Sequence, residues 1–320
     1  MESTGNPDPM MAMSTQYCAT WFEAGDFDNM LRWSQRVIDL ADGDPVKGAG
    51  YGNGSPLALA LVWRGMARYW LGLPGWRQDI EEAVALAGHR DPIILSTVRL
   101  WSYGFAIYYG VIRPDDSAVD LMEDALRITE AAGNDAAVSL VQFGLGAVLL
   151  SRDALADRLR GIEVLGRARQ VWIRRQVALQ DLPVIDLWVA RENARSGERD
   201  AAVPVMRRIV DELHESERLG YGVWATGVLV ETLLERDGVG DVAEAERAID
   251  RLVRLRSEVV SSVREITLLR LRTLLARTRG DDMVFRDLAG HYRALAESLG
   301  FEGHIAWAGA LASGSTIKMQ

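Results

Sequence analysis

The sequence predicts an all-α protein, built as an α-solenoid of about seven helical hairpins. Apolar residues recur at helical spacing along most of the chain, as at Trp76, Ile80, Val84 and Ala87. Turn residues, mostly glycine, recur every 38–47 residues, which is close to the period of helical-pair repeats. No stretch of useful length alternates apolar and polar residues as a half-buried strand does.

Residues 55–92 form the clearest predicted hairpin. Ser55-Pro56 combines a capping hydroxyl with proline at the first helical position. Residues 57–71 are apolar almost all round, so this first helix should be covered on more than one side. The glycines and proline of residues 72–75 predict a turn. An amphipathic second helix follows and should end before Pro92.

Six further hairpins are expected from the same pattern. Their helices pair residues 14–24 with 27–42, 94–109 with 117–132, 136–150 with about 154–176, 184–195 with 201–216, 221–235 with 242–255, and 259–278 with 283–299. Their turns fall at Gly25, Gly110, about Arg152, Gly197, Gly238 and Gly280. We expect residues 1–13 to be a disordered leader or a domain boundary, residues 14–312 a single repeat domain, and residues 313–320 a flexible tail.

Glycine also recurs inside the first helices of four units, at Gly65, Gly104, Gly144 and Gly227. A glycine in a helix interior costs about 1 kcal/mol relative to alanine. The repetition therefore predicts close helix–helix contact at these positions.

Composition limits the functional classes. The net charge of −9 and the pI near 5.1 exclude the basic face of a nucleic-acid-binding module. A single cysteine, Cys18, excludes an intrachain disulfide and suits a reducing cytosol. Apolar runs such as residues 140–150 are far shorter than the ~20 residues that span a bilayer, and the N-terminus lacks a signal-peptide pattern. We expect a cytoplasmic protein without membrane contact.

The glycine-rich segment 47–55 does not fit a phosphate-binding loop. A P-loop needs a lysine after its glycines, whereas Lys47 precedes them and the only other lysine is Lys318. A Walker-type ATPase site is therefore excluded. The segment is predicted to be a structural loop, with a ligand-gripping loop as the alternative.

No catalytic or metal-binding motif stands out. The four histidines, His89, His214, His291 and His304, form no HxxxH or HExxH pair, and no serine lies in a GxSxG motif. Glu302 and His304 are close in sequence and superficially suggest an acid/base pair, but a structural role for His304 is favoured. We therefore predict no catalytic residues, no cofactor and no metal.

Candidate ligand contacts come from the predicted inner helices. Six of the ten tryptophans are placed there, and amphipathic aromatic residues favour recognition surfaces. The weak candidates for ligand or partner binding are Trp63, Arg64, Arg68, Arg99, Tyr103, Asp186, Arg191, Glu192, Trp224 and Glu231. The alternative for the tryptophans is packing between repeats, and for the polar residues it is bridging between neighbouring helices.

Several segments resemble known repeats. GDFDNMLRWSQRVIDLADGDP, from Gly25, resembles the second half of a tetratricopeptide repeat. The segments DGDPVKG, GSPLALAL, LGLPGWRQD, ATGVLVETLL and SLGFEGHIAWA resemble the C-terminal, tetratricopeptide-like helical-repeat region of actinobacterial, especially mycobacterial, class III adenylate/guanylate cyclase–ATPase signalling proteins. The resemblance covers nearly all of residues 15–312.

This resemblance implies a tetratricopeptide-like α-solenoid that acts as a sensor or scaffold arm. The chain contains neither the cyclase nor the ATPase domain of that family, so neither activity is expected. The first hypothesis is a module that binds a ligand or protein partner and regulates a cyclase or ATPase. The second is a constitutive scaffold or self-association module without a small ligand. The third, from a different class, is an α-helical enzyme with a dispersed site around Glu302 and His304. A closed apolar pocket with convergent arginine and tryptophan would favour the sensor, and an open polar groove the scaffold.

Overall fold

The computed structural model describes residues 6–51, 54–88, 91–256 and 258–312, and these are helical without any strand. The predicted all-α, solenoid-like fold is confirmed. In chain order the elements are α1 (Asp8–Ala24), α2 (Phe27–Ala41), η2 (Ala49–Tyr51), α3 (Pro56–Leu71), α4 (Trp76–Ala87), α5 (Pro92–Arg99), η3 (Leu100–Gly104), α6 (Phe105–Tyr108), α7 (Asp116–Ala131), α8 (Asp135–Leu150), α9 (Leu155–Arg175), η4 (Leu179–Asp181), α10 (Leu182–Arg195), α11 (Arg199–Glu215), α12 (Leu219–Arg236), α13 (Asp241–Arg254), α14 (Ser262–Thr278), α15 (Asp282–Leu299) and α16 (Glu302–Ala312).

Local signals place the hairpins as expected. The Ser55 hydroxyl accepts a hydrogen bond from the amide of Ala58 at 3.2 Å and so caps α3. Gly72 ends that helix in the left-handed conformation. Nearly the whole surface of α3 is buried, as its apolar sequence predicts.

The N-terminal boundary differs from the prediction. Helix α1 begins at Asp8, so part of the expected leader is helical, and Met11 and Ala12 are buried in the core. A proline is tolerated in the first turn of a helix, which is why Pro9 does not delay its start. Residues 1–5 and 313–320, the other parts of the expected leader and tail, lie outside the described residues.

Two helical segments also differ. The expected helix over residues 94–109 is α5 and α6 joined by a π-helical turn, η3. A further helix, α16, follows the seventh hairpin and has no partner helix after it among the described residues.

The helix glycines mark close contacts in three of four cases. A Cβ on Gly65 would lie 3.0 Å from the Trp76 carbonyl oxygen, and one on Gly104 would lie 3.2 Å from the Cα of Gly144. One on Gly144 would collide with Met122 at 2.5 Å. The fourth prediction is wrong. A Cβ on Gly227 would have its nearest neighbour at 3.8 Å, because this residue borders a cavity instead of a packed helix.

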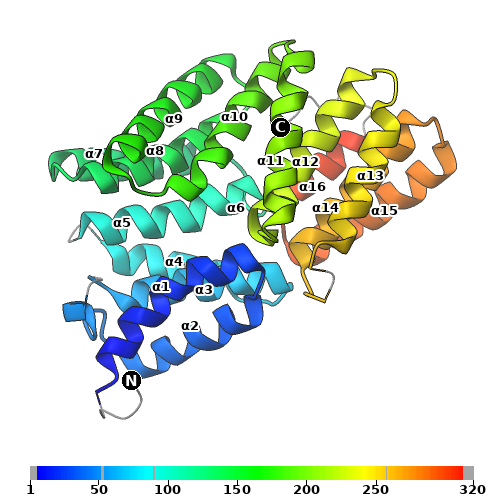
Figure 1. The fold of residues 1–320 in the computed structure, drawn as a ribbon. Helices are drawn as coiled ribbons and strands as arrows, with labels where there is room; N and C mark the ends of the chain where they lie inside the picture. The colour runs from blue at the N-terminus through cyan, green and yellow to red at the C-terminus, as the bar shows by residue number, and fades with distance from the viewer. Residues whose placement is uncertain (1–5, 52–53, 89–90, 257, 313–320) are drawn as a thin grey trace.

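The helices do not form an open solenoid, because the chain closes on itself. Helix α1 packs against α12, and α3 packs against α14, so the first two hairpins lie beside the sixth and seventh (Figure 1). The Arg77–Glu302 ion pair, at 2.8 Å, and the Arg218–Glu23 ion pair, at 2.9 Å, also join the two halves. These contacts bring the two ends of the repeat array together around the inner face.

A further closing contact joins the turn after α6 to the start of α16. The amide of Glu302 donates to the carbonyl oxygen of Val111 at 3.0 Å, and the amide of His304 donates to that of Gly110 at 3.1 Å. The two amides are among those that a helix N-terminus leaves without an intrahelical partner, and the two carbonyls belong to the turn that follows α6. A Cβ on Gly303 would lie 2.7 Å from the Gly110 oxygen, so only glycine permits this approach.

Aromatic side chains fill the centre of the closed ring. Phe22 of α1 makes edge-to-face contacts with Trp101, Phe105 and Tyr221, at centroid distances of 5.3 to 5.5 Å. Such pairs contribute about 0.5–1.5 kcal/mol beyond their buried area. Tyr109 donates its hydroxyl hydrogen to the Gly220 carbonyl oxygen at 2.7 Å, which fixes α6 against α12.

Substituting Gly110 by alanine should weaken ring closure. Gly110 and Gly133 both have left-handed φ, +67° and +66°, so alanine carries the same backbone strain of about 1–2 kcal/mol at either position. A Cβ on Gly110 would also lie 2.7 Å from the Trp307 ring, whereas one on Gly133 meets nothing within 4 Å. We expect Gly110→Ala to cost about 1–3 kcal/mol more than Gly133→Ala in urea denaturation. Equal losses would contradict the closing contact.

Candidate functional site

The ring encloses a central cavity, defined here by Trp188, Arg191, Trp224, Glu231, Arg270 and Trp307. These residues lie on α10, α12, α14 and α16, which face inward from successive repeats. The volume within which the centre of a water molecule can lie is about 30 Å³. Holding one water requires roughly 10–15 Å³ of such volume. The cavity therefore accommodates a group of a few heavy atoms.

Two guanidinium groups and one carboxylate meet at this cavity. Arg270 forms an ion pair with Glu231, and both side chains are about nine-tenths buried. Arg191 is 4% exposed and forms no ion pair with a described carboxylate. Its protein acceptor is the carbonyl oxygen of Leu150, at 3.4 Å from Nη1. The cavity wall therefore carries a net positive charge.

Aromatic rings support both cations. The Arg191 guanidinium lies 5.0 Å from the ring centroid of Trp188, and that of Arg270 lies 4.4 Å from Trp307. Arginine over an indole face gains electrostatic attraction that grows as water is removed. Even so, the pKa of Arg191 is lowered to about 9, chiefly by burial and also by the nearby Arg195, against the opposing effect of Glu231 and Glu192. Arg191 stays protonated at neutral pH, at an energetic cost.

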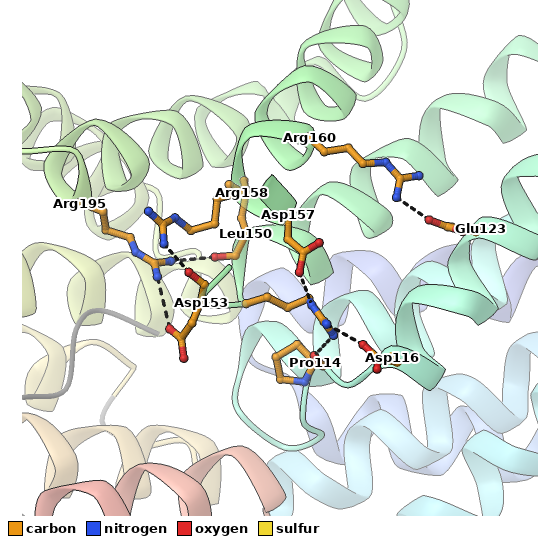
Figure 2. Close-up of polar contacts among 10 residues, drawn as sticks. Pro114, Asp116, Glu123, Leu150, Asp153, Asp157, Arg158, Arg160 and Arg195 are labelled. Atoms are coloured by element: carbon orange, nitrogen blue, oxygen red, sulfur yellow. Dashed lines mark hydrogen bonds and ion pairs between the residues drawn. The ribbon is translucent and has the colours of Figure 1, made fainter. Parts of the chain in front are cut away.

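An outer cleft of about 470 Å³ adjoins the central cavity, and Ile107, Ser151 and Trp307 line both. One wall of the outer cleft is the turn between α8 and α9, where charged side chains pair with one another (Figure 2). Arg152 bonds to Asp116 and Asp157, each at 2.6 Å.

On the other side of that turn, Arg195 reaches the Leu150 carbonyl oxygen at 3.1 Å and Asp153 at 3.6 Å (Figure 2). Arg195 and Arg191 thus share one carbonyl at the C-terminus of α8, where the helix dipole favours cations. Of these two arginines, Arg191 and Arg195, only Arg191 lines the central cavity.

Three of the residues proposed from the sequence meet in the central cavity: Arg191, Trp224 and Glu231. Two others pair with neighbouring helices, since Asp186 bonds to Arg169 at 3.1 Å and Glu192 to Arg158 at 2.9 Å.

Arg64 and Arg68 lie apart from the cavity and bind one buried carboxylate. Asp79 of α4 is 2% exposed and accepts from Arg64 at 2.6 Å and from Arg68 at 2.7 Å. Arg64 also bonds to Gln35 of α2 at 2.9 Å. These arginines bridge α2, α3 and α4, which is the alternative that the sequence left open.

The three remaining candidates lie around α3 and α5. Trp63 is buried against Trp101, with ring centroids 4.5 Å apart. Arg99 is buried, its Nε and Nη1 have no acceptor among the described residues, and burial lowers its pKa. Tyr103 is half-buried and lines a separate shallow cleft with Arg77 and Glu302.

Sequence reasoning missed Arg270 as a cavity residue. It placed Trp188 and Trp307 among the six tryptophans of the predicted inner helices but did not name them as ligand contacts. A signal for them exists, because the lining residues of each helix are spaced three or four apart, as in 188 with 191 and 304 with 307. That spacing identifies a shared helix face. Which faces converge depends on ring closure.

The buried histidines are held as neutral bases. The Nε2 of His304 lies 3.0 Å from the carbonyl oxygen of Tyr109, which only accepts, so Nε2 carries the hydrogen and Nδ1 accepts from the Tyr292 hydroxyl at 2.8 Å. Burial, with Arg270 adding to it, holds the pKa of His304 well below its usual range. Both ring nitrogens have partners, and Glu302 is engaged with Arg77. His89 lies outside the described residues.

His214 should make stability depend on pH. Burial lowers its pKa to about 4, so the unfolded state takes up a proton near pH 6.5 and the folded state does not. The contribution of the neutral His214 side chain to the free energy of unfolding is complete above pH 6.5, and it is lost as the pH falls toward 4. In His214→Gln the amide still donates to the Thr226 hydroxyl, the partner of His214 at 2.9 Å.

We expect the difference in unfolding free energy between wild type and His214→Gln to shrink by on the order of 1 kcal/mol from pH 7 to pH 5.5. Burial raises the pKa of Asp181 to about 6, and its titration changes stability in the opposite sense. Both proteins contain Asp181, so its effect cancels in the difference between their unfolding free energies. Urea denaturation at each pH measures it. A constant difference would mean that His214 titrates alike in both states.

Removing the shared carboxylate of α4 should be costly. Asp79→Ala leaves Arg64 and Arg68 without their partner, and breaking a buried ion pair costs about 3–5 kcal/mol. The matched control is Asp135→Ala, which removes an exposed pair with Arg175 and should cost little stability. Thermal denaturation of both variants measures the contrast. A small loss for Asp79→Ala would show that the three-helix bridge is not stabilising.

Within the described residues, no helix is both long and apolar enough to cross a membrane, and no three acidic, histidine or cysteine side chains are grouped to bind a metal. Neither a model of a known protein family nor a curated protein matches this chain.

Proposed function

We propose that this protein is a non-catalytic helical-repeat sensor, which binds a ligand or protein partner and regulates a signalling protein of the cyclase or ATPase type in the cytoplasm. The supporting observation is the central cavity. Arg191 and Arg270 converge there with three tryptophans from separate repeats, inside a closed ring. Convergent arginine and tryptophan side chains are what the sensor hypothesis expects, but the cavity is partly open and its wall is about as polar as it is apolar, so it is not the closed apolar pocket of that expectation.

The proposed mechanism is a shift between two ring conformations. The cavity wall spans α10 to α16, so an occupant that bridges these helices favours one relative placement of the repeats. A ligand shifts such an equilibrium only by its difference in affinity for the two states. The repeats that contact both the cavity and the attached effector would transmit that difference.

A constitutive scaffold remains the second candidate, favoured by a different surface. Helix α9 carries two exposed apolar side chains one turn apart, Leu155 and Leu159, with exposed fractions of 58% and 62%. Exposed apolar patches mark sites of protein interaction when they extend over neighbouring residues.

A thermal-shift screen of metabolites and nucleotides tests the sensor. A ligand at 100 times its Kd should stabilise the protein by about 2.7 kcal/mol. Gly227→Leu should abolish this stabilisation, because the new side chain extends into the cavity from a position with room for its Cβ.

The matched control is Gly290→Leu, at an exposed helix position on α15 with nothing within 4 Å of the added Cβ. It should leave the ligand effect unchanged. A ligand that stabilises both variants equally would place the site elsewhere. If no compound stabilises the protein while a peptide pull-down succeeds, the scaffold is favoured.

A further inference from the structure

The charge inventory of the central cavity is unbalanced. Arg191 and Arg270 bring two positive charges, and Glu231 brings one negative charge, already paired with Arg270. The next carboxylate along α10, Glu192, is paired with Arg158. One cation therefore has no carboxylate partner in a place where Arg191 is 4% exposed.

The hydrogen-bond inventory has the same bias. Trp188 Nε1 and Arg270 Nε are buried donors without an acceptor among the described residues. Arg191 has one weak bond to a carbonyl that it shares with Arg195. Leaving a buried donor unpaired destabilises the fold, and more so when the group is charged. Among the lining residues the Tyr108 hydroxyl and Glu231 Oε1 also lack a hydrogen bond, and Glu231 Oε1 is taken up by its ion pair with Arg270. The wall therefore offers more unpaired donors than acceptors.

We propose that the central cavity binds the carboxylate of a small organic monoacid, with Arg191 as its main ion-pair partner. This rests on the proposed sensor function and names the class of ligand. A carboxylate supplies the missing charge and accepts from the planar guanidinium in a bidentate way. The carboxylate group, of three heavy atoms, occupies the inner space, and the apolar body of the acid extends along the Trp307 ring into the outer cleft, which Trp307 also lines.

The surroundings select a single negative charge. The outer cleft that adjoins the cavity carries Asp115, Asp116, Asp153 and Asp157 against Arg113 and Arg152. A second anionic group on the ligand would enter this acidic cleft and be repelled, whereas an apolar body would not. The small volume of the inner space likewise favours a carboxylate over a larger phosphoryl group.

The test compares acids with neutral isosteres on the full chain. Acetate, propionate and benzoate are titrated against acetamide, propionamide and benzamide, at constant ionic strength, by calorimetry and thermal shift. At least one acid should bind saturably, with its amide at least tenfold weaker. Inorganic phosphate and chloride should not reproduce the effect.

Two variants locate the contact. Arg191→Met keeps the volume of the side chain and removes the charge, and it should weaken acid binding at least tenfold. Arg160→Met is the matched control, since Arg160 is paired with Glu123 and lines neither the central cavity nor the outer cleft. It should leave acid binding within about twofold of wild type. If Arg191→Met fails to fold, Arg191→Lys replaces it and should weaken acid binding while amide binding stays unchanged.

Equal binding of acids and amides, or acid binding that persists in the Arg191 variant, would overturn the carboxylate assignment. The same holds if chloride or phosphate matches the acids. If only other compounds bind, and Gly227→Leu blocks them, the carboxylate assignment fails and the sensor stands. If nothing binds in the cavity, both fail.

Discussion

The contact between the turn after α6 and the start of α16 is the constraint on which the rest of the structure depends. Two amides in the first turn of α16, which have no intrahelical partner, donate to the carbonyl oxygens of Gly110 and Val111 in the turn after α6. Only glycine at 110 and 303 allows this approach. Because this contact joins the last helix to the third repeat, the inner face becomes a partly enclosed space instead of an open groove.

Ring closure also explains why the interior combines aromatic packing with buried charge. Phe22, Tyr109 and Tyr221 come from repeats far apart in sequence and pack together only because the ring closes. The same closure takes Arg191 and Arg270 out of water. Buried charges rarely stabilise a fold better than apolar residues of the same size. Their presence at the one place where α10, α12, α14 and α16 converge is what supports a binding function.

The arginines of this chain serve two roles that residue type does not distinguish. Arg64 and Arg68 bind Asp79 within one hairpin and its neighbour, so they stabilise local helix packing. Arg191 lies four residues before Arg195 and shares a carbonyl with it, but it has no carboxylate of its own. The contrast between a cation with a partner and one without separates structural from functional candidates.

The sequence by itself determined the helical hairpins, their turns and the inward-facing layer, because caps, turn glycines and apolar periodicity act over a few residues. It also indicated Arg191, Trp224 and Glu231 as inward-facing. Their meeting with Arg270 and Trp307 was decided by the tertiary structure, since contacts between residues far apart in the chain leave no local pattern. The glycine at 227 shows the limit: its spacing matches Gly65 and Gly144, yet it borders a cavity. Whether a helix face meets another helix or open space depends on how the whole ring closes.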